Sequence, residues 1–365
     1  MKIYLWGQRN FFGGGVHFAN FSNAMKRLNF FGIQVHEVDI QGQDLQKVAD
    51  HTTSQDINIL FFPINENISL KGLIIKWGIF ETDILPTFYI DYLSNSQLIW
   101  VPSQWAQQIL LNHGIAKEKI DIVPEGVDPN VFHPFSRDLK IKDDVFRFYM
   151  LGKKEVRKGF SELLAGFKLA FENDPSVLLY LKADNFWSDQ VKKTDKNNEL
   201  RQELKALDLT NVKQITGQIQ TQQLSLIYSY CDALAFPTRA EGWGLPLGEA
   251  IACGMPVITN FHSGPTEYLE PVKDKIRCLD FILKKIDCSD FISSWGEGGS
   301  WALASPENIA EAMLDIRNNY GYWCEKALEA SAIIRSQFSW DRSVDKAISS
   351  LKEKDMITIQ IDLHI

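Results

Sequence analysis

The 365-residue sequence lacks the motifs that most directly indicate a metal or a dinucleotide cofactor. It has no Asp-x-Asp, no His-Glu-x-x-His and no Cys/His cluster, which disfavours a metal centre and leaves protein cations to supply positive charge. It also has no Gly-x-Gly-x-x-Gly, which disfavours a dinucleotide cofactor. We therefore expect neither a metal nor a cofactor.

Cysteine, basic residues and long apolar runs are also scarce. The five cysteines form no Cys-x-x-Cys pair, which indicates a reducing compartment. The excess of 46 acidic over 38 basic residues gives a net charge of -8 and argues against a nucleic-acid partner. No apolar run has the length of a transmembrane helix, and the N-terminus becomes polar too early for a signal peptide. These features predict a cytoplasmic protein.

The composition is that of a folded protein with more than one domain. Hydrophobic residues make up 45% and charged residues 23% of the 365 positions, so two domains are the default expectation. Apolar runs alternate with helical patterns, which predicts α/β domains with parallel sheets. The expected strands are 2–6, 35–40, 57–62, 73–80, 98–101, 119–123, 146–151, 177–181, 212–216, 233–236 and 256–259.

Helical patterns separate the predicted strands, and a break in them marks a linker. Helices are expected after Gly15, near Pro86, at the N-cap residue Ser103, and over 160–171, 199–207, 222–230 and 306–317. A polar, charged stretch around Pro134 interrupts the pattern. We therefore predict two Rossmann-like domains, at 1–138 and 145–337.

The C-terminal residues carry a separate signal. From Ile357 to Ile365, isoleucine and leucine alternate strictly with polar residues, which is the period of a β-strand. Such a strand could pack on its own chain or pair with a second copy, which would make a homodimer.

The most informative stretch is 237–256, which reads Pro-Thr-Arg-Ala-Glu-Gly-Trp-Gly-Leu-Pro-Leu-Gly-Glu-Ala-Ile-Ala-Cys-Gly-Met-Pro. An apolar run precedes it, two glycines interrupt it and Pro246 suits the first helical turn, so we expect a strand, a turn and a helix. Glu241 would lie on the turn and Glu249 about one turn into the helix. Both would face the carboxyl end of a parallel sheet, where α/β proteins bind ligands.

This arrangement suits a nucleotide sugar. A carboxylate can accept hydrogen bonds from two adjacent hydroxyls of a ribose or a hexose. Backbone N–H groups at Trp243, Gly244 and Leu245 have no helical partner at the helix start and can donate to ligand oxygens. The spacing of the two glutamates alone would favour the alternative, an ordinary strand–helix turn with two solvated acids.

The whole string resembles the E-x7-E signature of retaining glycosyltransferases with the glycosyltransferase-B (GT-B) fold, most closely those of family 4. The resemblance spans nearly the whole chain and is densest from Ile219 to Glu267. It implies two Rossmann-like domains facing a central cleft. It also implies that a last helix, introduced by Phe338-Ser-Trp, crosses back, so that 338–365 joins the first domain.

A basic loop, Gly152-Lys-Lys-Glu-Val-Arg-Lys-Gly159, follows the first predicted strand of the second domain. It would lie at the same sheet edge as the E-x7-E turn, which favours a diphosphate clamp of Lys153, Lys158 and Arg157 over a solvated basic loop. In the resembling family a Lys-Gly pair opens the next helix, and Lys158 and Gly159 match it. Lys153 stands where arginine is usual, which keeps the charge but loses the fork geometry.

Five positions in the first predicted domain are candidates by position. Gly14 and Gly15 follow the first strand and are expected to approach the donor, with His17 either on the helix surface or in contact with the ligand. Many family members have a histidine at a later strand end, where this chain instead reads Trp-Gly-Ile-Phe-Glu-Thr-Asp. Glu81 and Asp83 are therefore predicted to bind acceptor or sugar, or to cap the helix near Pro86.

Two further candidates follow from the resemblance in the second domain. Glu267 ends a Ser-Gly-x-x-Glu string that lies near donor phosphate or acceptor in the family. Ile219 precedes a predicted helix and is assigned to the donor side.

The resemblance implies a retaining, metal-independent hexosyltransferase. It would move a hexose from a nucleotide-diphosphate sugar, of GDP-mannose or UDP-glucose type, to a hydroxyl of a glycan or glycoconjugate. In this scheme Glu241 holds a sugar hydroxyl, Glu249 holds the ribose diol, and Lys153 and Lys158 hold the diphosphate. Peripheral attachment to a membrane is expected if the acceptor is lipid-linked. Two alternatives stay open, a nucleotide-sugar epimerase of the same fold and a catalytically degenerate sugar-nucleotide binding protein.

Overall fold

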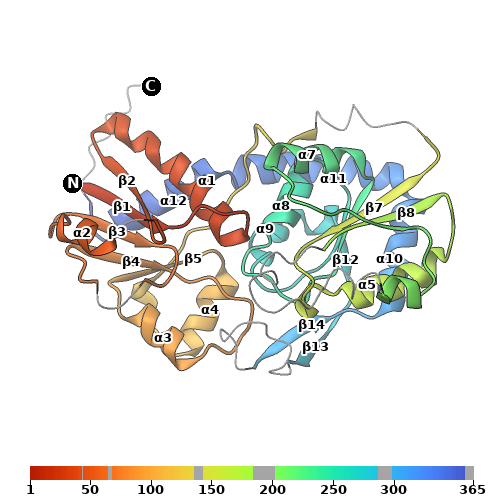
Figure 1. The fold of residues 1–365 in the computed structure, drawn as a ribbon, viewed down its shortest axis with the longest axis horizontal. Helices are drawn as coiled ribbons and strands as arrows, with labels where there is room; N and C mark the ends of the chain where they lie inside the picture. Colours follow the sequence, from red (N-terminus) through yellow and green to blue (C-terminus); the bar gives the residue numbers. More distant parts are fainter. Residues whose placement is uncertain (43, 65–67, 135–142, 184–201, 287–297, 358–365) are drawn as a thin grey trace. The chain divides into compact units, whose positions relative to one another are not determined.

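A computed structural model describes residues 1–42, 44–64, 68–134, 143–183, 202–286 and 298–357 (Figure 1). Contacts divide the chain into two compact units. Unit 1 comprises Met1–Glu81, Leu85–Gly126 and the segment that starts at Phe338. Unit 2 comprises Thr82–Ile84 and Val127–Gln337.

Unit 1 is built on a six-stranded parallel sheet with the order β2-β1-β3-β4-β5-β6. The strands are β1 Lys2–Gly7, β2 Gln34–Asp39, β3 Ile57–Leu60, β4 Leu73–Trp77, β5 Leu98–Val101 and β6 Ile120–Ile122. The helices are α1 Gly13–Met25, α2 Leu45–Asp50, α3 Thr87–Ser94, α4 Gln104–Asn112 and α12 Trp340–Glu353. Parallel sheets bury both faces, and each residue of the interior strand β5 is indeed buried.

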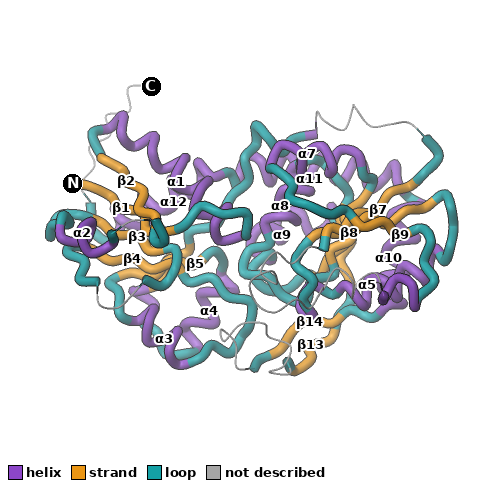
Figure 2. Tube along the Cα trace, viewed as in Figure 1, coloured by secondary structure: helices purple, strands orange, loops and turns teal. Residues whose placement is uncertain are grey.

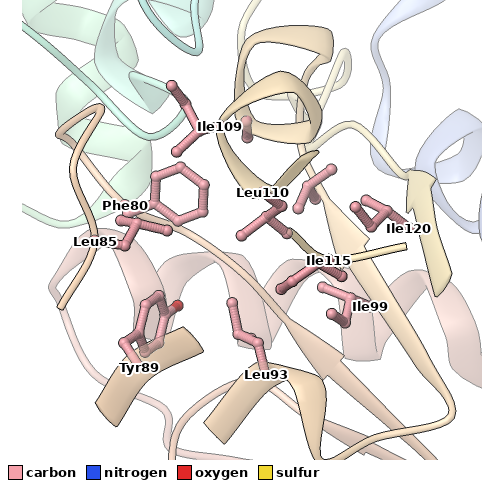
Figure 3. Close-up of a cluster of buried hydrophobic side chains, with 11 residues drawn as sticks. Phe80, Leu85, Tyr89, Leu93, Ile99, Ile109, Leu110, Ile115 and Ile120 are labelled. Carbon is pink, nitrogen blue, oxygen red and sulfur yellow. The ribbon is translucent and has the colours of Figure 1, made fainter. Parts of the chain in front are cut away.

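Strand β5 shows how the two faces of this sheet are covered. Ile99 and Val101 point into a cluster with Leu93 of α3 and Leu110 of α4 (Figure 3). The intervening Trp100 points to the other face, where its indole N–H donates to Ser350 Oγ of α12 at 2.9 Å. Because successive side chains alternate, one short apolar strand anchors helices on both sides.

Unit 2 has a second six-stranded parallel sheet with the order β12-β11-β10-β7-β8-β9. Its strands are coloured orange in Figure 2, where β7, β8 and β9 are labelled. Its strands are β7 Phe146–Leu151, β8 Val177–Lys182, β9 Val212–Gln214, β10 Ala233–Phe236, β11 Val257–Asn260 and β12 Arg277–Leu279. An antiparallel pair adds β13 Ile282–Lys285 and β14 Ser300–Leu303. The helices are α5 Phe160–Phe171, α7 Thr221–Tyr230, α8 Leu245–Ala252, α9 Thr266–Leu269, α10 Pro306–Asn318 and α11 Tyr320–Gln337.

The predicted α/β class with two parallel sheets is confirmed, and each predicted strand has a counterpart within a few residues. Ser103 caps α4 by accepting a hydrogen bond from the Ala106 N–H, as expected. The prediction that the first helix begins after Gly15 is wrong, since α1 already starts at Gly13. The predictions missed β12, the β13–β14 pair and α11, which are short, exposed or weakly amphipathic.

Three further predictions concern the boundary of the first domain, the last helix and the C-terminal strand. Residues 127–134, assigned from the sequence to the first domain, group with unit 2, where Val127 lies against Gly248 and Pro134 against Gly254. The last helix, α12, packs on α1 within unit 1. The proposed C-terminal strand falls on 358–365, outside the described residues, although Ile357 is buried.

Candidate functional site

The turn between β10 and α8 has the strand–turn–helix form predicted for the E-x7-E stretch. Gly244 is the N-cap of α8 with φ +83°, a left-handed conformation that favours glycine. Its carbonyl accepts a hydrogen bond from the Tyr268 hydroxyl at 3.1 Å, and the Trp243 ring lies 4.8 Å from the Tyr268 ring. Pro246 is the second residue of the helix, where its missing N–H costs nothing. The helix start is therefore held rigidly.

Glu241 on this turn is buried between two cations. Its carboxylate lies 2.6 Å from Lys158 Nζ and 3.1 Å from Arg157 Nη1, and only 5% of the residue is exposed. Burial disfavours the charged form, but the Lys158 ammonium and the Arg157 guanidinium outweigh it and hold the pKa of Glu241 below its usual value. Glu241 is therefore ionised at neutral pH.

The two cations come from the basic loop after β7, and the loop is locked to the E-x7-E turn. Arg157 Nη1 donates to the Ala240 carbonyl at 2.7 Å, and the Arg239 N–H donates to the Arg157 carbonyl at 2.7 Å. Gly159, with φ +71°, ends the loop where a Cβ atom would collide with the Pro237 backbone. Two strand ends that are far apart in sequence thus form one site.

The remaining loop residues complete the charge balance. Glu155 pairs with Arg157 at 3.3 Å, so that two acids face the two buried cations. Lys153 lies in the same loop and is half-buried.

A third loop closes over Glu241 from the end of β11. Ser263 Oγ accepts a hydrogen bond from the Glu241 N–H at 2.9 Å, and the Gly264 N–H donates to the Glu241 carbonyl at 3.0 Å. Glu267 follows on α9 and is half-buried. A Cβ atom at Gly264 would overlap the Gly242 carbonyl, so this loop can approach only with glycine at that position. Ser263 was not singled out from the sequence.

Glu249 lies one turn into α8, as predicted, but it is enclosed. Only 7% of the residue is exposed, and Oε2 lies 3.2 Å from the hydroxyl of Tyr228 on α7. Burial raises the pKa of Glu249 to about 7, against a smaller lowering by the Tyr228 hydrogen bond. The picture of two solvated acids is therefore wrong, since both glutamates are buried. Sequence reasoning missed Tyr228, which sits unmarked in an amphipathic helix.

Three other predicted site residues, Ile219, Asp83 and Glu81, are placed as follows. Ile219 is half-buried and directly precedes Gln220, the N-cap residue of α7. Asp83 groups with unit 2, where its carboxylate accepts a hydrogen bond from the Ser300 N–H at 2.7 Å. Glu81 is half-buried and belongs to unit 1. Asp83 therefore caps a strand of unit 2 and does not cap α3.

Two glycines of unit 1, Gly14 and Gly15, are crowded, which explains why they are glycines. A Cβ atom at Gly14 would lie 2.8 Å from the Phe62 ring, and one at Gly15 would collide with Asn10. Both lie in the first turn of α1.

His17 is not on the helix surface, so that alternative is wrong. It is 1% exposed and packs against the rings of Phe61, Trp77 and Trp340, with ring centroids 4.3–5.6 Å away. Its assignment to the acceptor side stays a prediction that would require the ring to become accessible.

His17 faces a second buried titratable group, Glu125. Their Nδ1 and Oε1 atoms lie 3.8 Å apart, and Glu125 is 3% exposed. Burial lowers the pKa of His17 to about 3 and raises the pKa of Glu125 to about 8. Both side chains are therefore mainly uncharged near neutral pH.

This pair predicts a loss of stability at alkaline pH. Between pH 6.5 and pH 8 the unfolded chain has released the Glu125 proton, whereas the folded chain retains it. The free energy of unfolding should therefore fall by about 1.4 kcal/mol per pH unit. Below pH 6.5 the unfolded His17 takes up a proton that the folded ring does not, which opposes the Glu125 effect down to about pH 4.5. Urea unfolding should show Glu125→Gln losing about 2 kcal/mol less than wild type over this alkaline interval. Equal losses would contradict the assignment.

The described part of the chain holds no group of three or more His, Cys, Asp or Glu side chains that could bind a metal ion. None of its helices combines the length and apolarity needed to cross a membrane.

The site lies within a region that matches a known family. Residues 132–278 match the model described as glycosyl transferases group 1. Among curated proteins, the chain is similar to mannosylfructose-phosphate synthase of Agrobacterium fabrum, with 27% identity over 48% of this chain and 40% of the relative. The first three such relatives are covered over 39–49% of their length, so the chain spans less than half of each.

Solved structures match over nearly the whole chain. The sucrose-phosphate synthase of Thermosynechococcus elongatus has a TM-score of 0.71 at 14% identity, covering 97% of this chain and 99% of that one. Anabaena HepE in complex with UDP and glucose has a TM-score of 0.65 at 16% identity, covering 96% and 100%. The chain therefore has the GT-B fold, and its residues 132–278 are similar to the group 1 glycosyl transferases.

Proposed function

We propose that this protein is a retaining glycosyltransferase that uses a nucleotide-diphosphate hexose and needs no metal. The observation that carries the proposal is the buried Glu241 held between Lys158 and Arg157 at the end of two parallel strands. The ionised carboxylate can accept a hydrogen bond from a sugar hydroxyl. The two buried cations beside it can bind the negatively charged diphosphate of the same donor. The match of 132–278 to the group 1 glycosyl transferases supports this proposal.

The donor would be held by unit 2. The N–H groups at the start of α8, around Leu245, point toward the turn and suit a diphosphate oxygen. Lys153 and Lys158 would neutralise the diphosphate, and Glu249 would accept hydrogen bonds from the ribose diol. The UDP and glucose bound in the HepE structure support a nucleotide sugar as donor. The relatives named MMP α-(1→4)-mannosyltransferase and D-inositol 3-phosphate glycosyltransferase support transfer of a sugar.

The chemical step follows from these placements. The acceptor hydroxyl attacks C1 from the face that the diphosphate leaves, and a diphosphate oxygen takes its proton. The C1–O bond to the diphosphate breaks as the new C1–O bond forms. Lys158 and Lys153 stabilise the charge that develops on the leaving group, which is commonly the largest catalytic contribution. Glu241 holds a hydroxyl of the hexose and keeps Lys158 in position.

The proposal is tested by binding and then by turnover. In a thermal-shift screen of UDP, GDP and ADP, one nucleotide should raise the melting temperature, because a ligand that binds only the folded state stabilises it. The matching sugar nucleotides are then incubated with and without glycan acceptors. Transfer with retained anomeric configuration supports the proposal. Epimer formation without acceptor, or binding without any turnover, would overturn it.

Transfer should survive removal of divalent metals. The cations that face the leaving group come from the chain itself, namely Lys153, Arg157 and Lys158. Activity in excess EDTA should stay within about twofold of the untreated protein, since no metal contributes charge stabilisation. Loss of activity that Mg²⁺ or Mn²⁺ restores would show that the metal-free mechanism is wrong.

A further inference from the structure

The buried contact between Tyr228 and Glu249 has the geometry of a proton relay. The Tyr228 hydroxyl lies 3.2 Å from Glu249 Oε2 and 3.1 Å from the carbonyl oxygen of Pro246. The hydroxyl carries one proton, so it can donate to only one of these two acceptors at a time. Tyr228 is fully buried and Glu249 nearly so, which makes any unsatisfied polar group costly.

The two protonation states of Glu249 use this geometry differently. When Glu249 is protonated, it can donate to the Tyr228 oxygen while Tyr228 donates to the Pro246 carbonyl. When Glu249 is ionised, Tyr228 must turn its proton to the carboxylate and release Pro246. The ionised carboxylate accepts stronger, charge-assisted hydrogen bonds from ribose hydroxyls than the protonated acid does, so the ligand favours the ionised state.

We propose that Tyr228 is a positioning residue for the donor site, which couples nucleotide binding to release of the Glu249 proton. This proposal rests on the proposed function, in which Glu249 accepts the ribose diol. The hydroxyl of Tyr228 stabilises the ionised carboxylate and fixes its Oε2 atom, leaving Oε1 to face the ligand. Binding therefore selects the ionised form and expels one proton to solvent.

The surroundings make Glu249 the group that titrates near neutral pH. Burial raises its pKa to about 7. Within the described residues, its titratable neighbours include Tyr228 on α7 and Tyr149 on β7, and burial holds the pKa of both phenols well above the usual value. Both phenols therefore stay uncharged where Glu249 changes state. The thiol of Cys253 also lies near Tyr228.

The expected pH dependence of binding follows directly. The apparent dissociation constant equals the intrinsic one divided by the ionised fraction, which is roughly 0.1 at pH 6 and 0.9 at pH 8 for a pKa of about 7. Affinity for the nucleotide should thus be about tenfold weaker at pH 6 than at pH 8. At pH 7 binding should release about half a proton per site.

Calorimetry on the full-length protein tests the proposal, with the nucleotide that gave the thermal shift. Titrations at pH 6, 7 and 8 in buffers of different ionisation enthalpy give both affinity and proton release. Tyr228→Phe should weaken binding about fivefold at pH 7 and move the pH midpoint up by about one unit, because it removes a hydrogen bond to a charged group. Its effect should fall on KM for the donor and leave kcat nearly unchanged.

Tyr149→Phe is the matched control. It removes the same hydroxyl from a buried tyrosine whose ring lies 5.9 Å from that of Tyr228, and within the described residues that hydroxyl has no hydrogen-bond partner. Its pH profile should follow wild type. Comparing variants at each pH also cancels the titration of the nucleotide phosphates, which is common to all.

The outcomes separate this proposal from the proposed function. A wild type that binds nucleotide without releasing a proton, or a Tyr228→Phe profile equal to wild type, overturns the relay but leaves the transferase intact. Glu249→Gln should abolish proton release, and retained release in that variant also overturns the relay. If Tyr228→Phe fails to fold, proton release by wild type and by Glu249→Gln still decides the matter. No binding of any nucleotide overturns both proposals.

Discussion

Replacing Glu241 by glutamine is expected to lower kcat by about 10³-fold. Loss of one electrostatic contact at a reacting centre lowers kcat by a factor on the order of 10²–10³, and this substitution removes two roles of the carboxylate together. The carboxylate both accepts a hydroxyl of the hexose and holds Lys158 Nζ at 2.6 Å. Glutamine keeps the shape but carries no charge, and its amide N–H₂ would face Arg157 Nη1, another donor. The measurement is steady-state transfer with donor and acceptor both saturating.

Glu241→Gln tests catalysis more directly than Glu241→Ala, because alanine would also destabilise the fold. Glu241→Ala would leave Lys158 and part of Arg157 buried without their carboxylate, which typically costs about 3–5 kcal/mol. The control is Glu162→Gln, which removes another partly buried acid of unit 2, paired with Arg239 at 2.6 Å. That variant should transfer within about threefold of wild type, since it loses one ion pair of modest worth away from Lys158. A folded Glu241→Gln protein with near-normal turnover would remove Glu241 from the mechanism.

The sequence predicted the sheets well because parallel strands leave a strong local signal. Strands buried on both faces are continuous apolar runs, such as Ala233–Phe236, and glycine or a capping residue ends each unit of the pattern. The turn at Gly244 was predictable for the same reason, since local chain chemistry fixes it. Short or exposed elements, such as β13 with all four residues exposed, carry no such signal.

The sequence predicted which residues belong to the candidate site, but not which of them contact each other. Glu241 and Lys158 were both named from sequence, yet their direct contact spans 83 residues of chain and depends on strand order. The burial of Glu249 and its contact with Tyr228 likewise depend on how α7 packs beside α8. The burial of His17 could not be predicted either, because a polar residue beside a glycine loop carries no local signal that aromatic rings will enclose it.

Trp340→Ala is expected to destabilise unit 1 by about 3–5 kcal/mol, the usual cost of removing a buried tryptophan side chain. Trp340 opens α12, is 6% exposed and stacks on His17 with a centroid distance of 5.6 Å and an interplanar angle of 20°. The Ser339–Trp340 backbone also lies against Gly126, where a Cβ atom would collide with it. The loss would therefore open a cavity between α12 and α1.

Chemical denaturation followed by far-ultraviolet circular dichroism measures this loss as a lower midpoint, and native-state hydrogen exchange assigns it to unit 1. The control is Arg342→Ala on the same helix, whose side chain is 65% exposed and should change stability by no more than about 0.5 kcal/mol. Faster exchange in α12 and at the Trp100 indole, which donates to Ser350 of α12, should accompany the change. Equal midpoints for Trp340→Ala and Arg342→Ala would contradict a role for the aromatic stack around His17. They would show instead that polar contacts hold α12, chiefly the hydrogen bonds that join Trp100, Ser350 and Asp121.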